Sequence, residues 1–147
     1  MRSRLKGLLV SAPVLQAPDF SRPFNLAVDA SDVGAGAVLL QRGPDNVEHP
    51  VCYFSRKLNS HQRAYSTIEK EALSLVLAIQ QFEVYLGSSS HPTTVYSDHD
   101  PLRFLNRMRN SNQCLMRWSL ILKPYDLEIM HVRGADNILA DALSRGH

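Results

Sequence analysis

The sequence contains no long hydrophobic run. No stretch of the 147 residues approaches the ~20 consecutive apolar residues that a membrane span needs. Near the N-terminus, the apolar segment 8–10 is also too short for a secretory signal. We therefore expect an intracellular protein that makes no contact with a membrane.

Cysteine is scarce as well. Cys52 and Cys114 are the two in the chain; they lie far apart, and neither belongs to a CxxC motif. This pattern argues against a disulfide framework and against a zinc site, so we expect two buried thiols. Low-complexity tracts and internal repeats are also absent, and the length suits one domain with a core of its own.

Charge of one sign is not in large excess. The chain has 16 Lys and Arg against 14 Asp and Glu, a net charge of +2, which does not by itself indicate a nucleic-acid partner. Four arginines nevertheless fall within one short region: Arg103, Arg107, Arg109 and Arg117. They fit either a phosphate-binding surface or an ordinary solvated helix face.

The pattern of turns and apolar positions divides the chain into a lead-in and one domain. Residues 1–23 contain Pro13, Pro18 and Pro23 and are expected to form an extended linker. The domain then covers residues 24–147. We expect strands at 24–29, 35–41, 50–56, 93–97 and 127–132, and helices at 66–86, 101–108, 112–122 and 138–144.

This order of elements indicates an α/β fold. Three strands in succession favour an antiparallel meander, and the later strand–helix units favour parallel pairing with covered faces. We therefore predict a mixed five-stranded sheet flanked by helices. The helix at 66–86 is the best-marked element, because Ser66 and Glu69 form a capping box at its first turn.

Four acidic residues occupy positions where a purely exposed role is awkward. Asp29 and Asp98 end predicted strands, Glu71 shares an apolar helix stripe, and Asp141 lies in the last helix. Each has a structural alternative: a turn for Asp29, a helix cap for Asp98, an arginine partner for Glu71, and the helix dipole for Asp141. Together, however, three aspartates and a glutamate match the oxygen ligands of a paired divalent-metal site.

Four short segments surround the four acids, in this order: Val28-Asp29-Ala30-Ser31, Glu69-Lys70-Glu71-Ala72-Leu73, Tyr96-Ser97-Asp98-His99 and Ala140-Asp141-Ala142-Leu143-Ser144-Arg145. In these motifs the sequence resembles the ribonuclease H domain of gypsy-type LTR retrotransposon reverse transcriptases. The resemblance extends over about residues 24–145, and the lead-in looks like the family's link from polymerase to nuclease. Val28 and Ser97 stand where the family usually has threonine, and Asp100 stands where lysine is common.

The resemblance implies a ribonuclease H-like fold and a function in reverse transcription. Asp29, Glu71, Asp98 and Asp141 would hold two Mg²⁺ ions, for which Mn²⁺ could substitute, and hydrolysis of the RNA in an RNA–DNA hybrid would leave 3′-hydroxyl and 5′-phosphate ends. The partners would be the hybrid and the polymerase domain of the parent polyprotein. The location would be a cytoplasmic virus-like particle or the nucleus.

Substrate contacts are also expected. Ser31 and the glycines at 34 and 36 (Gly34, Gly36) would lie close to the RNA, whose 2′-hydroxyls distinguish it from DNA. The side chains of Arg103, Arg107 and Arg109 would bind phosphates of the DNA strand. Trp118 is expected in the core rather than stacked on a base, and His131 is expected to be structural.

Two other functions remain open from the sequence. A domesticated, catalytically silent module that binds nucleic acid or protein would have the same fold, although its four acids would not need to be intact. A transposase or integrase catalytic domain also shares the general fold. Its usual three-acid order lacks the glutamate in the first helix, so it fits this chain less well.

Overall fold

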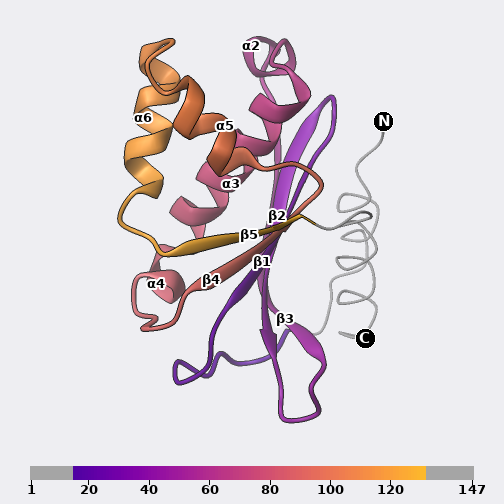
Figure 1. The fold of residues 1–147 in the computed structure, drawn as a ribbon. Helices are drawn as coiled ribbons and strands as arrows, with labels where there is room; N and C mark the ends of the chain where they lie inside the picture. The colour runs from indigo at the N-terminus through magenta and orange to yellow at the C-terminus, as the bar shows by residue number, and fades with distance from the viewer. Residues whose placement is uncertain (1–14, 132–147) are drawn as a thin grey trace.

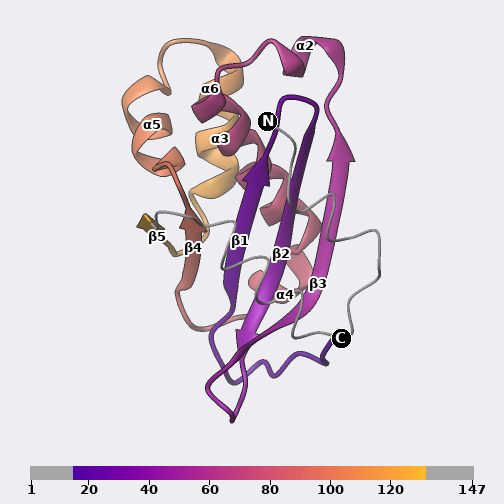
Figure 2. The same ribbon diagram turned by 90° about the vertical axis from the view of Figure 1, so that its right-hand side faces the viewer.

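The computed structural model of the protein describes residues 15–131, and its centre is one mixed sheet. Within these residues the strands run in the spatial order β3-β2-β1-β4-β5 (Figures 1 and 2). The first two neighbouring pairs are antiparallel and the last two are parallel, as predicted. The strands are β1 (Asn25–Ala30), β2 (Gly34–Arg42), β3 (Glu48–Lys57), β4 (Thr93–Ser97) and β5 (Leu127–His131).

Helices cover one face of this sheet (Figure 1). The long helix α3 packs on β1 and β2, and it also contacts the two helices that follow β4. None of the helices found between residues 15 and 131 has the length and apolar character needed to cross a membrane. The helices are α2 (Ser60–Arg63), α3 (Thr67–Gln81), α4 (Glu83–Leu86), α5 (Pro101–Met108) and α6 (Gln113–Leu122).

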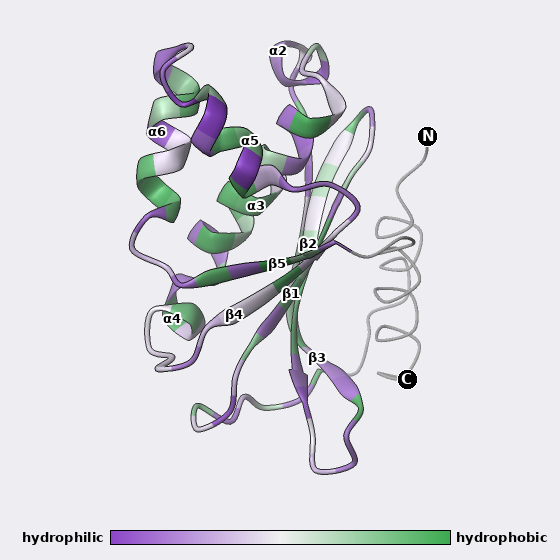
Figure 3. Cartoon of the chain, viewed as in Figure 1, coloured by the Kyte–Doolittle hydropathy of each residue, from purple (hydrophilic) through white to green (hydrophobic). Residues whose placement is uncertain are grey.

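The core lies between the helices and the sheet (Figure 3). Leu26 and Val28 enter it from β1, and Leu75 and Ile79 enter it from α3. Trp118 of α6 is also buried there, with its ring edge-on to Tyr65 at a centroid distance of 5.8 Å. The expectation that Trp118 is a core residue is therefore confirmed.

The start of α3 follows the sequence pattern, but its end does not. Ser66 Oγ accepts from Glu69 N–H at 3.3 Å, and Glu69 Oε1 accepts from Ser66 N–H at 2.9 Å, so the predicted capping box is present. The predicted helix 66–86 is broken at Phe82, where the backbone leaves helical geometry. Because the buried Phe82 ring packs edge-on against Phe54 and Leu86 is also buried, the apolar pattern continues across the break.

Two further details differ from the expectations. The short helix α2 was not predicted, although Asn59 and Gln62 form a capping box at its start. Cys52 and Cys114 were expected to be buried, but both are half-buried. Burial still raises the pKa of the Cys52 thiol to about 12, so this thiol stays protonated at neutral pH.

The described part of the lead-in, residues 15–23, packs against the sheet. Gln41 of β2 accepts from Asp19 N–H at 2.8 Å, and its amide donates to the backbone carbonyls of Asp19 and Arg22. The ring of Phe20 stacks on Tyr85 at 6.3 Å. These contacts fix the direction in which the chain enters β1, while the boundary between linker and domain at residue 23 stays a prediction.

Candidate active site

Two of the four acidic residues lie at the C-terminal ends of two neighbouring parallel strands. The register of β1 and β4 pairs Ala27 with Tyr96, and two residues further on each strand are Asp29 and Asp98. Asp29 is still in β1, whereas Asp98 follows the last residue of β4. Because side chains alternate along a strand, Asp29 belongs to the face opposite the core residue Val28.

Glu71 reaches the same corner from α3. It is 7% exposed, and its Oε2 accepts from the Ser97 hydroxyl at 3.3 Å. A second link joins the helix to β1, since the hydroxyl of Ser74 lies 3.4 Å from the backbone carbonyl of Asp29. Hydrogen bonds thus connect α3, which carries Glu71, to the end of β4 that precedes Asp98 and to the backbone of Asp29.

The alternative role of Asp98 as a helix cap is not what the structure shows. Asp100 is the N-cap of α5, where its carboxylate accepts from Arg103 N–H at 3.0 Å. Asp98 is exposed beside it, and the ring of His131 donates through Nε2 to the backbone carbonyl of Asp98. This contact agrees with the structural role expected for His131, because it ties the end of β4 to β5.

The donor chemistry of this corner suits a hard divalent cation. Carboxylate and hydroxyl oxygens are among the ligands that Mg²⁺ prefers, and both kinds are present here in Glu71 and Ser97. Among residues 15–131, however, no three His, Cys, Asp or Glu side chains are grouped so that they could hold a metal ion. Glu71 comes from the helix-covered face and Asp29 from the other, and Asp141 lies outside the described residues.

Ser31 and Gly34 belong to the turn between β1 and β2. Ser31 is buried, and its hydroxyl accepts from Gly34 N–H at 3.1 Å, so the side chain stabilises the turn itself. A Cβ at Gly34 would meet only Arg56 O at 3.5 Å and Ser31 Oγ at 3.7 Å, which are ordinary contacts. Packing within the described protein therefore does not require glycine at position 34.

Gly36 lies directly across from Asp29 on the neighbouring strand, and its other partner, on β3, is Ser55. Side chains of cross-strand pairs stand on the same face, with Cβ atoms about 4.5–5.5 Å apart. Any side chain at position 36 would therefore stand beside the carboxylate of Asp29. Gly36 itself is buried, in contrast to the half-buried Gly34.

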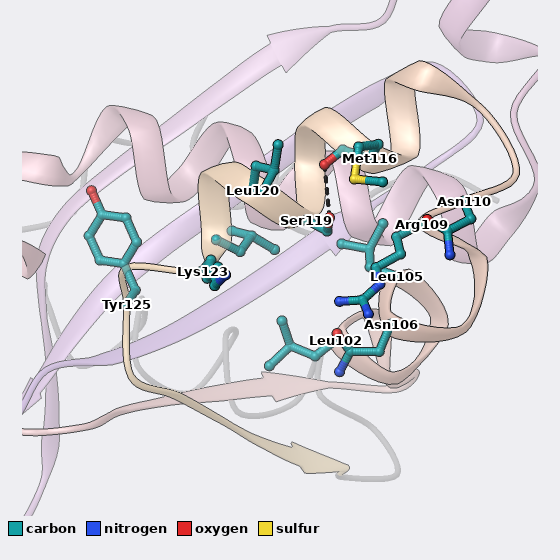
Figure 4. Close-up of a pocket in the computed structure, with 11 residues that line it drawn as sticks. Leu102, Leu105, Asn106, Arg109, Asn110, Met116, Ser119, Leu120, Lys123 and Tyr125 are labelled. Atoms are coloured by element: carbon teal, nitrogen blue, oxygen red, sulfur yellow. Dashed lines mark hydrogen bonds between the residues drawn. The ribbon is translucent and has the colours of Figure 1, made fainter.

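The predicted phosphate-binding arginines are exposed, but they lie on different sides of α5. Arg103 and Arg107 line one surface hollow, which also includes Asp100 and Ile129. Arg109 lines another hollow, between α5 and α6 (Figure 4). No carboxylate of the described residues forms an ion pair with any of the three guanidinium groups.

The sequence comparisons place this arrangement in a known family. The model of the RNase H-like domain found in reverse transcriptase matches residues 19–125. The chain belongs to this family. The match covers every described strand except β5 and includes Asp29, Glu71 and Asp98.

Relatives of this RNase H-like domain are transposon polyproteins. The retrovirus-related Pol polyprotein from transposon 297 of Drosophila melanogaster is 42% identical over 142 residues, which are 97% of this chain and 13% of the relative. The transposon Tf2-3 polyprotein of Schizosaccharomyces pombe is 41% identical over 143 residues, 96% of this chain and 11% of the relative. The chain thus spans little more than a tenth of these relatives, and its resemblance to gypsy-type reverse transcriptases is confirmed.

Solved structures confirm the ribonuclease H-like fold. The foamy viral protease-reverse transcriptase in complex with RNA/DNA hybrid has a TM-score of 0.64 at 14% identity, over 82% of this chain and 16% of that one. RNase H1 from the archaeon Halobacterium salinarum has a TM-score of 0.51 at 16% identity, over 82% of this chain and 93% of that one. At these identities the likeness shows the fold of the domain.

Proposed function

We propose that this RNase H-like domain hydrolyses the RNA strand of RNA–DNA hybrids during reverse transcription. The observation that carries the proposal is the hydrogen bond to Glu71 of α3 from Ser97, which precedes Asp98 on the strand next to β1 with Asp29. The related foamy viral enzyme was solved with an RNA/DNA hybrid, which supports the choice of substrate. The chain covers 13% of a relative that is a Pol polyprotein, and its family is found in reverse transcriptase. Its proposed partner is therefore the polymerase domain of a parent polyprotein.

The four acids have one proposed task. Asp29, Glu71 and Asp98, with Asp141 outside the described residues, would hold two Mg²⁺ ions or Mn²⁺ in their place. Bound there, the cations would supply Lewis-acid activation of the attacking water and neutralise charge that builds up on the phosphate. The protein's own contribution is to fix carboxylates from three separate elements at one place.

The glycines and arginines would select and hold the hybrid. Gly34 and Gly36 would let the RNA strand approach the backbone of the β1–β2 hairpin, since neither carries a side chain beside the acidic corner. Arg103 and Arg107 would bind DNA-strand phosphates from the hollow beside Asp100. Arg109, on the other side of α5, would contact the same strand only if the hybrid reaches the α5–α6 hollow.

Cleavage of labelled duplexes tests the proposed function. With Mg²⁺ or Mn²⁺ the purified domain is expected to cut the RNA of a hybrid and to leave duplex DNA and duplex RNA intact. Chelator is expected to stop the reaction. A domain that binds the hybrid but never cuts it, with either cation, would instead support the catalytically silent alternative.

Replacing Arg107 by alanine is expected to weaken hybrid binding in a salt-dependent way. With one phosphate contact fewer, binding of the hybrid releases fewer counterions. The slope of the logarithm of the binding constant against the logarithm of the salt concentration should therefore fall in magnitude by about 0.9. Binding titrations between 50 and 200 mM salt would measure it, with Arg22→Ala, in the exposed segment before β1, as a control of equal charge. An unchanged slope in Arg107→Ala would show that Arg107 belongs to an ordinary solvated helix face and does not bind a phosphate.

A further inference from the structure

Ser97 is a buried hydroxyl to which the sequence analysis assigned no role. It is the last residue of β4, it is 0% exposed, and it directly precedes Asp98. The backbone N–H of His99 donates to Ser97 Oγ at 3.2 Å, and Ser97 Oγ donates to Glu71 Oε2 at 3.3 Å. Ser97 therefore connects the backbone beside one acid to the carboxylate of another.

The directions of these two bonds follow from the groups involved. A backbone N–H can only donate, so it occupies a lone pair of the serine oxygen, and a carboxylate can only accept, so it receives the single hydroxyl proton. Glu71 lies on a helix and has a long side chain with several rotatable bonds. The hydroxyl holds one of its two oxygens at the end of β4, next to Asp98.

We propose that Ser97 is a positioning residue, which holds the Glu71 carboxylate in the orientation that binds a divalent cation. The proposal rests on the proposed function, because it assigns Glu71 to the cation. Groups that orient a ligand in this way alter metal affinity by about 10–100-fold when they are removed. A serine that merely filled a buried position would have no such effect on cation affinity.

The test uses three substitutions in the full chain. Ser97→Ala removes the hydroxyl and Ser97→Thr keeps it. Thr93→Val is the matched control, because Thr93 is also buried, lies on the same face of β4, and is at the far end of the strand. Should the alanine variant fail to fold, Ser97→Cys takes its place, since a thiol is only a weak donor.

Binding of Mn²⁺ without substrate, followed by electron paramagnetic resonance of the free ion, is the first readout. Ser97→Ala is expected to bind Mn²⁺ about 10–100-fold more weakly, while Ser97→Thr and Thr93→Val bind like the wild type. The Mg²⁺ concentration for half-maximal hybrid cleavage should shift in parallel. Equal Mn²⁺ binding by wild type and Ser97→Ala would overturn the proposal while the proposed function stands. If the wild-type protein never cut the hybrid, the proposed function would be wrong, and this inference, which rests on it, would be wrong too.

Discussion

Replacing Glu71 by glutamine is expected to lower hybrid cleavage by about 1,000-fold or more. Cations at a phosphoryl site contribute several kcal/mol to the transition state, and each 1.36 kcal/mol corresponds to about tenfold in rate. Glutamine keeps the size of the side chain and can still accept from Ser97, so the loss would come from the missing charge. Single-turnover cleavage of a labelled hybrid at saturating Mg²⁺ measures this effect.

Glu69 supplies the matched control, because it lies two residues earlier on the same helix and its carboxylate caps the helix start. Glutamine can take over this capping bond, so Glu69→Gln is expected to retain both activity and stability. Melting curves in chelator should show Glu71→Gln at least as stable as the wild type, because removing one negative charge relieves repulsion among neighbouring acids. An active Glu71→Gln protein, or an inactive but stable Glu69→Gln protein, would contradict the roles assigned to the two glutamates.

Replacing Trp118 by alanine is expected to produce the largest loss of stability, about 3–5 kcal/mol. The indole is 7% exposed and packs between α6 and the elements around Tyr65, so its removal leaves a cavity where the helices meet. Urea denaturation measures the change in free energy of unfolding. Trp118→Phe, which refills part of the space, should cost less.

The same substitution separates a core role from a base-stacking role. If Trp118 acts through packing alone, the folded fraction of Trp118→Ala should bind the hybrid as the wild type does at a temperature where it remains native. Binding lost without a loss of stability would indicate that the indole contacts the nucleic acid. The buried position of the ring predicts the first result.

Features encoded by nearby residues could be predicted from the sequence. The Ser66–Glu69 capping box needs residues only three positions apart, and the alternation along β1 placed Leu26 and Val28 in the core. The antiparallel pairing of the first three strands and the parallel pairing of the later ones followed from simple rules for connections. The four acids were selected because they lie at strand ends or within helices, where an exposed role is hard to explain. The order of the motifs that contain them matched that of the family.

Features that depend on tertiary contacts could not be predicted in this way. The helix breaks at Phe82, whose buried ring packs against Phe54 of β3, while the apolar spacing continues unchanged across the break. Asp98 was considered as the cap of the following helix, whereas the structure assigns the cap to Asp100, two residues later. Likewise, sequence proximity grouped Arg107 with Arg109, although the helix turns them toward different hollows.

The ends of the cleaved RNA test the central claim most directly. A water molecule that attacks the phosphodiester leaves a 5′-phosphate on one fragment and a 3′-hydroxyl on the other, whereas attack by the RNA's own 2′-hydroxyl leaves a 2′,3′-cyclic phosphate and a 5′-hydroxyl. The measurement is mass spectrometry of the fragments released from an RNA–DNA hybrid by the wild-type domain in Mg²⁺, with a chelator control. We predict 5′-phosphate and 3′-hydroxyl ends, an intact DNA strand and no products in chelator. Cyclic phosphate ends, or cleavage that continues in chelator, would contradict the account.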